Sequence, residues 1–182
     1  MNEKYRLFIA IEFPADVVSE LERTETLLRR ARVEGNFTAL KNFHLTLAFL
    51  GDTEPSRVPE IADLMDDCAG EPIPLTIGPL DFFHRREGDI LIRRLSCPPE
   101  LAQLQKRLSR GLRGMGFRLE NRLYQPHLTL ARECVLPAGT ALEDLSGRVP
   151  EVSFTAGDMT LFWSHRPGGR LTYTPLHVTV LP

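Results

Sequence analysis

The chain is poor in cysteine and has no long apolar run. Its 182 residues include three cysteines, an odd number without paired metal-ligand spacing, so the sequence predicts neither a disulfide framework nor a zinc site. No apolar stretch approaches the ~20 residues that cross a bilayer, and the first residues do not resemble a secretion signal. We therefore expect no membrane association and a cytoplasmic location.

The chain also lacks an excess of either charge. Its formal net charge is -2, which excludes indiscriminate nucleic-acid binding by bulk positive charge, so any nucleic acid would be bound by a local patch. The hydrophobic content of 42% is enough to fill a core, and no low-complexity stretch marks a linker. We therefore expect a single domain over residues 1–182.

What the chain does contain is a repeat. The string His-Leu-Thr-Leu-Ala occurs at 44–48 and again at 127–131, each time within a strand-like run. Successive side chains of a strand leave opposite faces, so the histidine and threonine of each copy share one face while the leucines share the core face. Two such strands facing each other would bring two imidazoles and two hydroxyls into one groove, which predicts an acid–base site.

A single His-x-Thr pattern is weak evidence, because strands commonly alternate polar and apolar residues. The alternative interpretation of either copy is a half-buried strand with a polar face. The segment 177–179 provides a comparison within the chain, since His177-Val178-Thr179 has the same spacing but lacks the flanking Leu-Ala. We interpret that segment as an ordinary strand face.

The repeat extends beyond the five residues. Phe8 precedes His44 by 36 positions, Leu91 precedes His127 by 36 positions, and both stretches read as strand, helix and motif strand. This order predicts two structurally similar, intertwined lobes. The expected helices are 15–32, 57–68 and 100–113, and the expected strands are 6–12, 44–50, 73–80, 89–95, 117–119, 127–132, 152–163 and 171–181.

Three segments resemble a known family: Arg-Leu-Phe-Ile-Ala-Ile-Glu-Phe-Pro at 6–14, Phe-His-Leu-Thr-Leu-Ala-Phe-Leu-Gly at 43–51 and Pro-His-Leu-Thr-Leu-Ala-Arg at 126–132. They resemble the two-histidine phosphoesterase superfamily, in particular the bacterial and archaeal RNA 2′,3′-cyclic phosphodiesterases, historically called 2′-5′ RNA ligases. The resemblance implies an α+β fold with two pseudo-symmetric lobes. Each lobe is expected to have an antiparallel sheet flanked by helices, with the active-site cleft between the sheets.

The resemblance also implies the reaction and the site. It implies a monomeric enzyme that hydrolyses RNA 2′,3′-cyclic phosphodiester ends to 2′-phosphomonoesters, on RNA ends or nucleotides, without a metal or cofactor. The matching residues are His44 and His127 as catalytic groups, Thr46, Thr129 and Arg132 as phosphate-binding groups, and Phe49 as a nucleobase contact. The chain departs from many members before the first motif, where Leu40-Lys41-Asn42-Phe43 replaces a Pro-Glu-Asn pattern.

Histidine suits such a reaction because its ordinary pKa of about 6.5 lets one imidazole act as a base while another acts as an acid. By resemblance, His44 protonates the 3′-oxygen and His127 activates water, although the near-identical motifs leave the two roles interchangeable. Two alternatives also stay open: 2′-5′ RNA ligation by the same site, and a noncatalytic nucleotide- or RNA-binding module. A histidine-ligated metal site lacks nearby carboxylate or cysteine ligands in the sequence.

Other candidate contacts lie in predicted turns. His84-Arg85-Arg86 and His165-Arg166 are expected to be solvated, with contact to RNA as the alternative. We expect Trp163 to pack in the core or on a sheet, with a cleft wall as the alternative.

Overall fold

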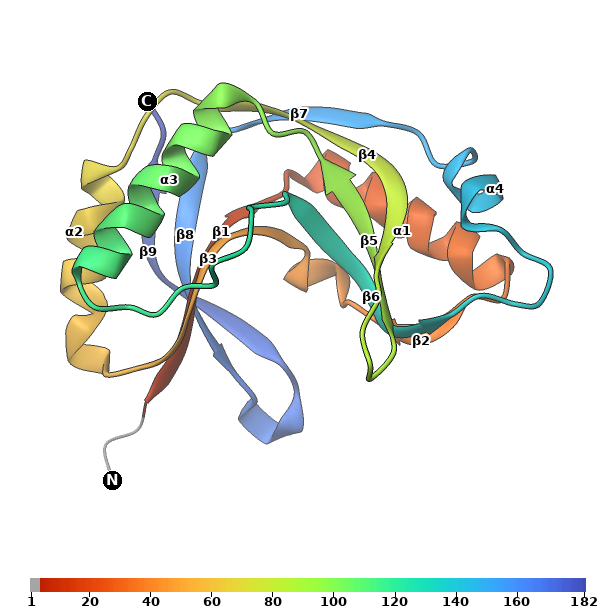
Figure 1. Ribbon diagram of the computed structural model, residues 1–182, viewed down its shortest axis with the longest axis horizontal. Helices are drawn as coiled ribbons and strands as arrows, with labels where there is room; N and C mark the ends of the chain where they lie inside the picture. The colour runs from red at the N-terminus through yellow and green to blue at the C-terminus, as the bar shows by residue number, and fades with distance from the viewer. Residues whose placement is uncertain (1–3) are drawn as a thin grey trace.

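The computed structural model describes residues 4–182, which form two antiparallel sheets with helices on their outer faces (Figure 1). The first sheet has the order β3-β1-β8-β9, with strands β3 (His44–Thr53), β1 (Tyr5–Glu12), β8 (Asp158–His165) and β9 (Thr172–Val180). The second sheet has the order β2-β6-β5-β4-β7, with strands β2 (Glu34–Phe37), β6 (His127–Val135), β5 (Asp89–Leu95), β4 (Ile73–Phe83) and β7 (Val152–Ala156).

The two sheets repeat one arrangement. In each sheet the motif strand, β3 or β6, pairs with the strand that precedes it along the repeat, β1 or β5. A third antiparallel partner follows in each, β8 beside β1 and β4 beside β5. The predicted α+β fold with two similar lobes is therefore confirmed, and β2 is an additional edge strand of the second sheet.

The helices are α1 (Ala15–Arg30), α2 (Val58–Asp67), α3 (Pro99–Gly114) and the short α4 (Leu142–Ser146), with 3-10 turns at Leu40–Asn42, Pro55–Arg57 and Pro167–Gly169. Leucines at helical spacing in α3, namely Leu101, Leu104, Leu108 and Leu112, are all buried, as their periodicity predicted. Within residues 4–182, every helix is too short or too polar to cross a membrane.

Each long helix covers the sheet of the opposite lobe. The helix α1 follows β1 of the first sheet but contacts β7 of the second, and α3 lies between β5 and β6 in sequence but contacts β3 and α2 (Figure 1). The chain path thus links the two lobes through their covering helices. The domain boundary of 1–182 stays a prediction, and residues 1–3 lie outside the described part of the chain.

One predicted strand is divided between the two sheets. Residues 152–163 were expected to form a single strand, but β7 ends at Ala156 in the second sheet and β8 begins at Asp158 in the first. The carbonyl of Gly157 between them accepts a hydrogen bond from the Leu181 amide at 2.8 Å. Sequence alternation reports a local period only, so it did not reveal the change of partner strand.

Two other strand predictions also need correction. Residues 117–119 are not a strand, because Phe117 and Leu119 pack against the core from an irregular segment instead of pairing with a neighbouring strand. The first motif strand was expected to end at Gly51-Asp52, but β3 continues to Thr53. An irregularity in the pairing with β1 accommodates Gly51, whose φ of 73° is easily adopted by glycine.

Candidate active site

The six residues singled out from the sequence line one cleft. The motif strands β3 and β6 lie near each other although they belong to different sheets. Between the lobes is a cleft with a volume of about 820 Å³, and its lining includes His44, Thr46, Phe49, His127, Thr129 and Arg132. The structure therefore brings the predicted residues together, while their individual roles stay predictions.

Both imidazoles are oriented in the same way. The Nδ1 atom of His44 lies 2.7 Å from the Asn42 carbonyl oxygen, and Nδ1 of His127 lies 2.7 Å from the Gln125 carbonyl oxygen. A carbonyl oxygen only accepts, so each neutral ring carries its proton on Nδ1. The Nε2 atom of each ring is left with a lone pair for proton transfer in the cleft.

Aromatic rings hold the two histidines in place. The His44 ring lies against Phe8, with ring centroids 5.0 Å apart, and meets Tyr173 edge-on at 5.3 Å. The His127 ring meets Phe83 edge-on at 4.7 Å. These contacts limit rotation of the imidazoles and keep water away from part of each ring.

Burial lowers the pKa of both histidines from 6.5. For His44, loss of hydration is the main cause, the bond to the Asn42 carbonyl opposes it, and the charges of His127 and Arg132 lower the pKa further. For His127, burial again dominates, opposed by its carbonyl bond, and the positive charges of Arg122, Arg94 and Arg132 add to the lowering. The empty cleft therefore favours neutral imidazoles, and a bound phosphate anion would favour a protonated one.

The remaining predicted residues differ in exposure. Thr46 and Thr129 are half-buried on the cleft faces of their strands, whereas Arg132 is exposed at the cleft. Phe49 is 46% exposed, and the Arg6 guanidinium lies 4.7 Å from its ring centroid. An exposed ring under a guanidinium can stack with a nucleobase, as expected for Phe49.

The sequence interpretation missed several cleft residues. In the sequence analysis Phe8 served only to measure the spacing of the repeat. In the structure it lines the cleft beside His44, on the same face of β1 as Ala10. The other missed lining residues include Arg6, Lys41, Arg170 and Tyr173. Arg166, for which contact with RNA was the alternative expectation, also lines the cleft. Their positions depend on how distant segments meet, so a local pattern carried no signal for them, apart from the turn location of Arg166.

One further contact links the two motif strands directly. The Tyr124 hydroxyl, in the segment before β6, donates a 3.0 Å hydrogen bond to the Thr46 carbonyl of β3. Tyr124 is followed at once by Gln125, whose carbonyl orients His127. A single short segment therefore contacts one proposed catalytic strand and orients the histidine of the other.

The comparison segment and the tryptophan lie outside the cleft. His177 Nε2 and Thr179 Oγ1 both bind the Asp66 carboxylate of α2, at 2.8 and 2.6 Å, so this His-x-Thr pattern attaches a helix to its sheet. Trp163 stacks on Tyr5 and on His165, with ring centroids 4.2 and 3.9 Å apart, which agrees with sheet packing.

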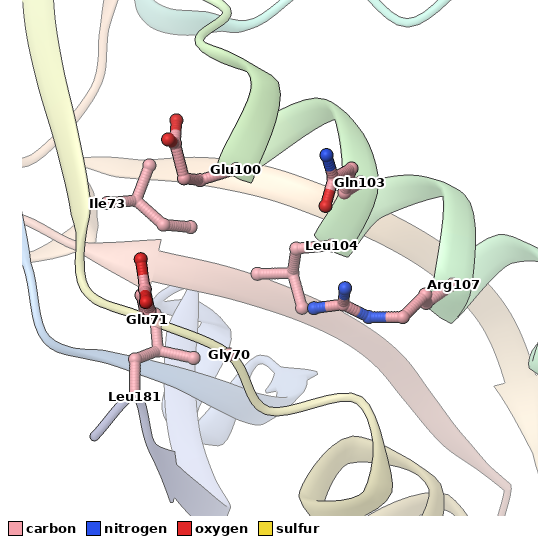
Figure 2. A pocket seen from close by; sticks show the side chains of 8 residues that line it. All are labelled: Gly70, Glu71, Ile73, Glu100, Gln103, Leu104, Arg107 and Leu181. Carbon is pink, nitrogen blue, oxygen red and sulfur yellow. The ribbon is translucent and has the colours of Figure 1, made fainter.

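A second cavity, of about 250 Å³, lies between α3, the α2–β4 connection and the last residues (Figure 2). Arg107 reaches from α3 toward Gly70 in this view, and its guanidinium donates a 3.0 Å hydrogen bond to the Cys68 carbonyl. Glu71 and Glu100 also line it, but none of the six predicted residues does. The cavity is a gap at a packing contact, separate from the histidine cleft. Over residues 4–182, no three histidine, cysteine or acidic side chains are grouped as metal ligands would be.

Comparisons with known proteins agree on one family. The sequence profile of the 2′-5′ RNA ligase superfamily matches residues 14–168. The RNA 2′,3′-cyclic phosphodiesterase of Escherichia coli is 30% identical over 183 residues, covering 97% of this chain and 96% of the relative. The enzyme of the same name from Methanocaldococcus jannaschii is 26% identical over 149 residues, covering 82% of this chain and 83% of the relative. The crystal structure of E. coli LigT complexed with 3′-AMP superposes with a TM-score of 0.80 at 28% identity, covering 98% of this chain and 99% of LigT.

Proposed function

The chain belongs to the 2′-5′ RNA ligase superfamily, and on that premise we propose that it is an RNA 2′,3′-cyclic phosphodiesterase that produces 2′-phosphomonoester ends. The names of its curated relatives support the reaction class. The observation that carries the proposal is the matched pair of histidines, each bound through Nδ1 to a backbone carbonyl and each lining the same cleft. Simple phosphate binding does not require two groups oriented for proton transfer.

The proposed reaction is an in-line displacement at phosphorus. His127 Nε2 removes a proton from water, the oxygen of that water bonds to phosphorus, and the bond from phosphorus to the 3′-oxygen breaks. A protonated His44 donates its Nε2 proton to the leaving 3′-oxygen, so the phosphate stays on the 2′-oxygen. At the end the two histidines have exchanged protonation states, and solvent restores them.

The threonines and the arginine would stabilise the charge that develops during this displacement. Thr46, Thr129 and Arg132 line the cleft. The two hydroxyls would donate hydrogen bonds to the nonbridging oxygens, and Arg132 would add a positive charge. Phe49 would stack with the nucleobase. We propose that no metal takes part, so activity should persist in a chelator; loss of activity in a chelator, with recovery on addition of one divalent ion, would contradict this.

A turnover assay tests the proposal. An RNA oligonucleotide ending in a 2′,3′-cyclic phosphate should be converted to a 2′-phosphate end, with products separated by chromatography and the isomer identified by its resistance to 3′-specific phosphatase. His44→Ala and His127→Ala should each lower the rate by about 10²–10⁴-fold. Joined products would indicate ligation, and tight binding without turnover would indicate a binding module.

The finer parts of the proposal are a monomer, a cytoplasmic location and RNA ends as the substrate. A monomer is supported by the cleft, because both proposed catalytic histidines come from one chain. Light scattering after gel filtration should give the mass of one chain, 20.6 kDa, and specific activity should not change with enzyme concentration.

A further inference from the structure

Four basic residues line the cleft without a part in the proposed reaction, and one of them, Arg6, lies over the Phe49 ring. The other three are Lys41 in the 3-10 turn before β3, and Arg166 and Arg170 at the two ends of the β8–β9 turn. All three side chains are exposed, and in the described chain none forms an ion pair with a carboxylate. By contrast, Arg29 is paired with a glutamate of its own helix α1, and Arg57 is paired with a glutamate of the adjoining helix α2. The charge of this basic cluster is therefore available to an anion.

The turn that carries the two arginines is held at its base. The His165 ring stacks on Trp163 with ring centroids 3.9 Å apart, and His165 Nε2 forms a 2.7 Å hydrogen bond with Thr174 across the hairpin. The Leu171 carbonyl accepts a 3.5 Å hydrogen bond from Asn42, which connects the hairpin to the segment that carries Lys41. The turn projects beyond the end of the first sheet (Figure 1). Binding to such a held segment costs less conformational entropy than binding to a free loop.

The basic cluster lies next to the catalytic histidine of the first lobe. Tyr173, at the start of β9, lies edge-on to His44 at 5.3 Å. Arg132 and Arg166 line the same cleft as Tyr173, and their positive charges oppose the rise in the Tyr173 pKa that burial causes. Arg166 therefore lines the cleft together with His44 and Tyr173, where a nucleotide beside the reacting one would lie.

The cleft is more basic than one phosphate requires. The whole chain has a net charge of -2, yet the cleft lining holds one carboxylate, Glu133, and five basic side chains: Arg6, Lys41, Arg132, Arg166 and Arg170. A nucleoside 2′,3′-cyclic phosphate has one phosphate group, which Arg132 and the two threonines would bind. An RNA end brings a further phosphodiester with each nucleotide, and such anions attract unpaired arginines strongly.

We propose that Lys41, Arg166 and Arg170 form a second phosphate subsite, which binds the phosphodiester next to the cyclic end and makes an oligonucleotide end the preferred substrate over a mononucleotide. This inference rests on the proposed function, because it places the cyclic phosphate between His44 and His127. It assigns the specificity for chain length to the β8–β9 turn.

The test compares three substrates that end in the same nucleoside cyclic phosphate: the mononucleotide, a dinucleotide, and a dinucleotide with a neutral methylphosphonate linkage. For the wild type we expect kcat/KM to be about 10- to 100-fold higher for the charged dinucleotide than for the other two, as charge-assisted hydrogen bonds typically contribute. The double variant Arg166→Ala/Arg170→Ala should lose that advantage and keep its mononucleotide kcat/KM within about twofold. Lys41→Ala should lose part of it.

The matched control is Arg85→Ala/Arg86→Ala, which removes two exposed arginines from the β4–β5 turn outside the cleft lining. That variant should process all three substrates like the wild type. Equal wild-type rates on the charged and neutral dinucleotides would overturn the subsite, and so would an equal loss on mononucleotide and dinucleotide in the double variant.

Calorimetry with the 2′-phosphorylated products separates this inference from the proposed function. If the wild type turns over no cyclic phosphate, the proposed function fails. The subsite would still be supported if the double variant loses affinity for the dinucleotide product and keeps its affinity for the mononucleotide product. It would be overturned if the ratio of the dinucleotide affinity to the mononucleotide affinity is the same for the wild type and the double variant.

Discussion

Removal of one hydroxyl group should weaken the connection between the two motif strands. Tyr124→Phe keeps the ring and deletes the group that donates to the Thr46 carbonyl at 3.0 Å. Burial raises the pKa of Tyr124, so the hydroxyl stays protonated and donates throughout the working pH range. The substitution therefore removes one hydrogen bond without changing a charge.

The expected cost follows from the burial of the pair. A net hydrogen bond contributes about 1 kcal/mol, and an acceptor left unsatisfied away from water raises the cost to about 1–3 kcal/mol. For a chain of this size, each kcal/mol shifts Tm by about 2–4 °C, so we expect a fall of about 2–12 °C. Because Thr46 also lines the cleft, kcat should fall by about 3- to 30-fold, equivalent to roughly 0.7–2 kcal/mol of transition-state stabilisation.

Thermal unfolding and steady-state kinetics on the cyclic oligonucleotide check both numbers. The matched control is Tyr5→Phe, since Tyr5 stacks on Trp163 away from the cleft, and this change should alter stability by less than about 0.5 kcal/mol. A Tyr124→Phe variant with the wild-type Tm and kcat would refute the reasoning. A lower Tm with unchanged kcat would restrict Tyr124 to a stabilising role.

Three more perturbations have defined outcomes. Burial lowers the pKa of His44 and of His127 from 6.5. As pH rises through the lowered pKa, the histidine that acts as the acid loses its proton and kcat/KM declines. We therefore expect the maximum of kcat/KM below pH 6.5. Arg132→Gln removes a charge that lowers both values, so the pH–rate maximum should move upward while the rate falls; an unmoved maximum would contradict the assignment. Gly111→Ala should destabilise the protein by about 1–3 kcal/mol in denaturant titrations, because a methyl group there would overlap Leu64 of α2, and Leu64→Ala in the same chain should restore part of the loss. Hydrogen bonds from Thr179 and His177 lower the pKa of Asp66 below 3.8, so the contribution of Asp66 to folding stability is present above that pH and is lost as pH falls through the lowered pKa. Asp66→Asn should remove this part of the loss of stability in acid. An unchanged dependence of stability on acid pH would contradict the role of these hydrogen bonds.

Much of the fold could be predicted because its signals are local. The leucines of α3 recur at helical spacing and are buried, and the two motif strands alternate as a period of two requires. Partner choice is not local, which explains the corrections. The alternation changes phase at Gly157, from apolar Phe154 and Ala156 to apolar Met159 and Leu161. That break does not reveal that the two halves pair with β4 and with β1 in different sheets.

The site follows the same division. The repeated pentapeptide determined by itself that two histidines and two threonines would share strand faces, because side-chain direction along a strand depends only on position. Tertiary structure alone decided that both imidazoles are bound through Nδ1 to carbonyls and that Tyr124 reaches Thr46. It also decided that the arginines of the β8–β9 turn line the histidine cleft. Those contacts depend on how the two sheets pack together and on helices α1 and α3, each of which covers the sheet of the opposite lobe. No stretch of neighbouring residues encodes that packing.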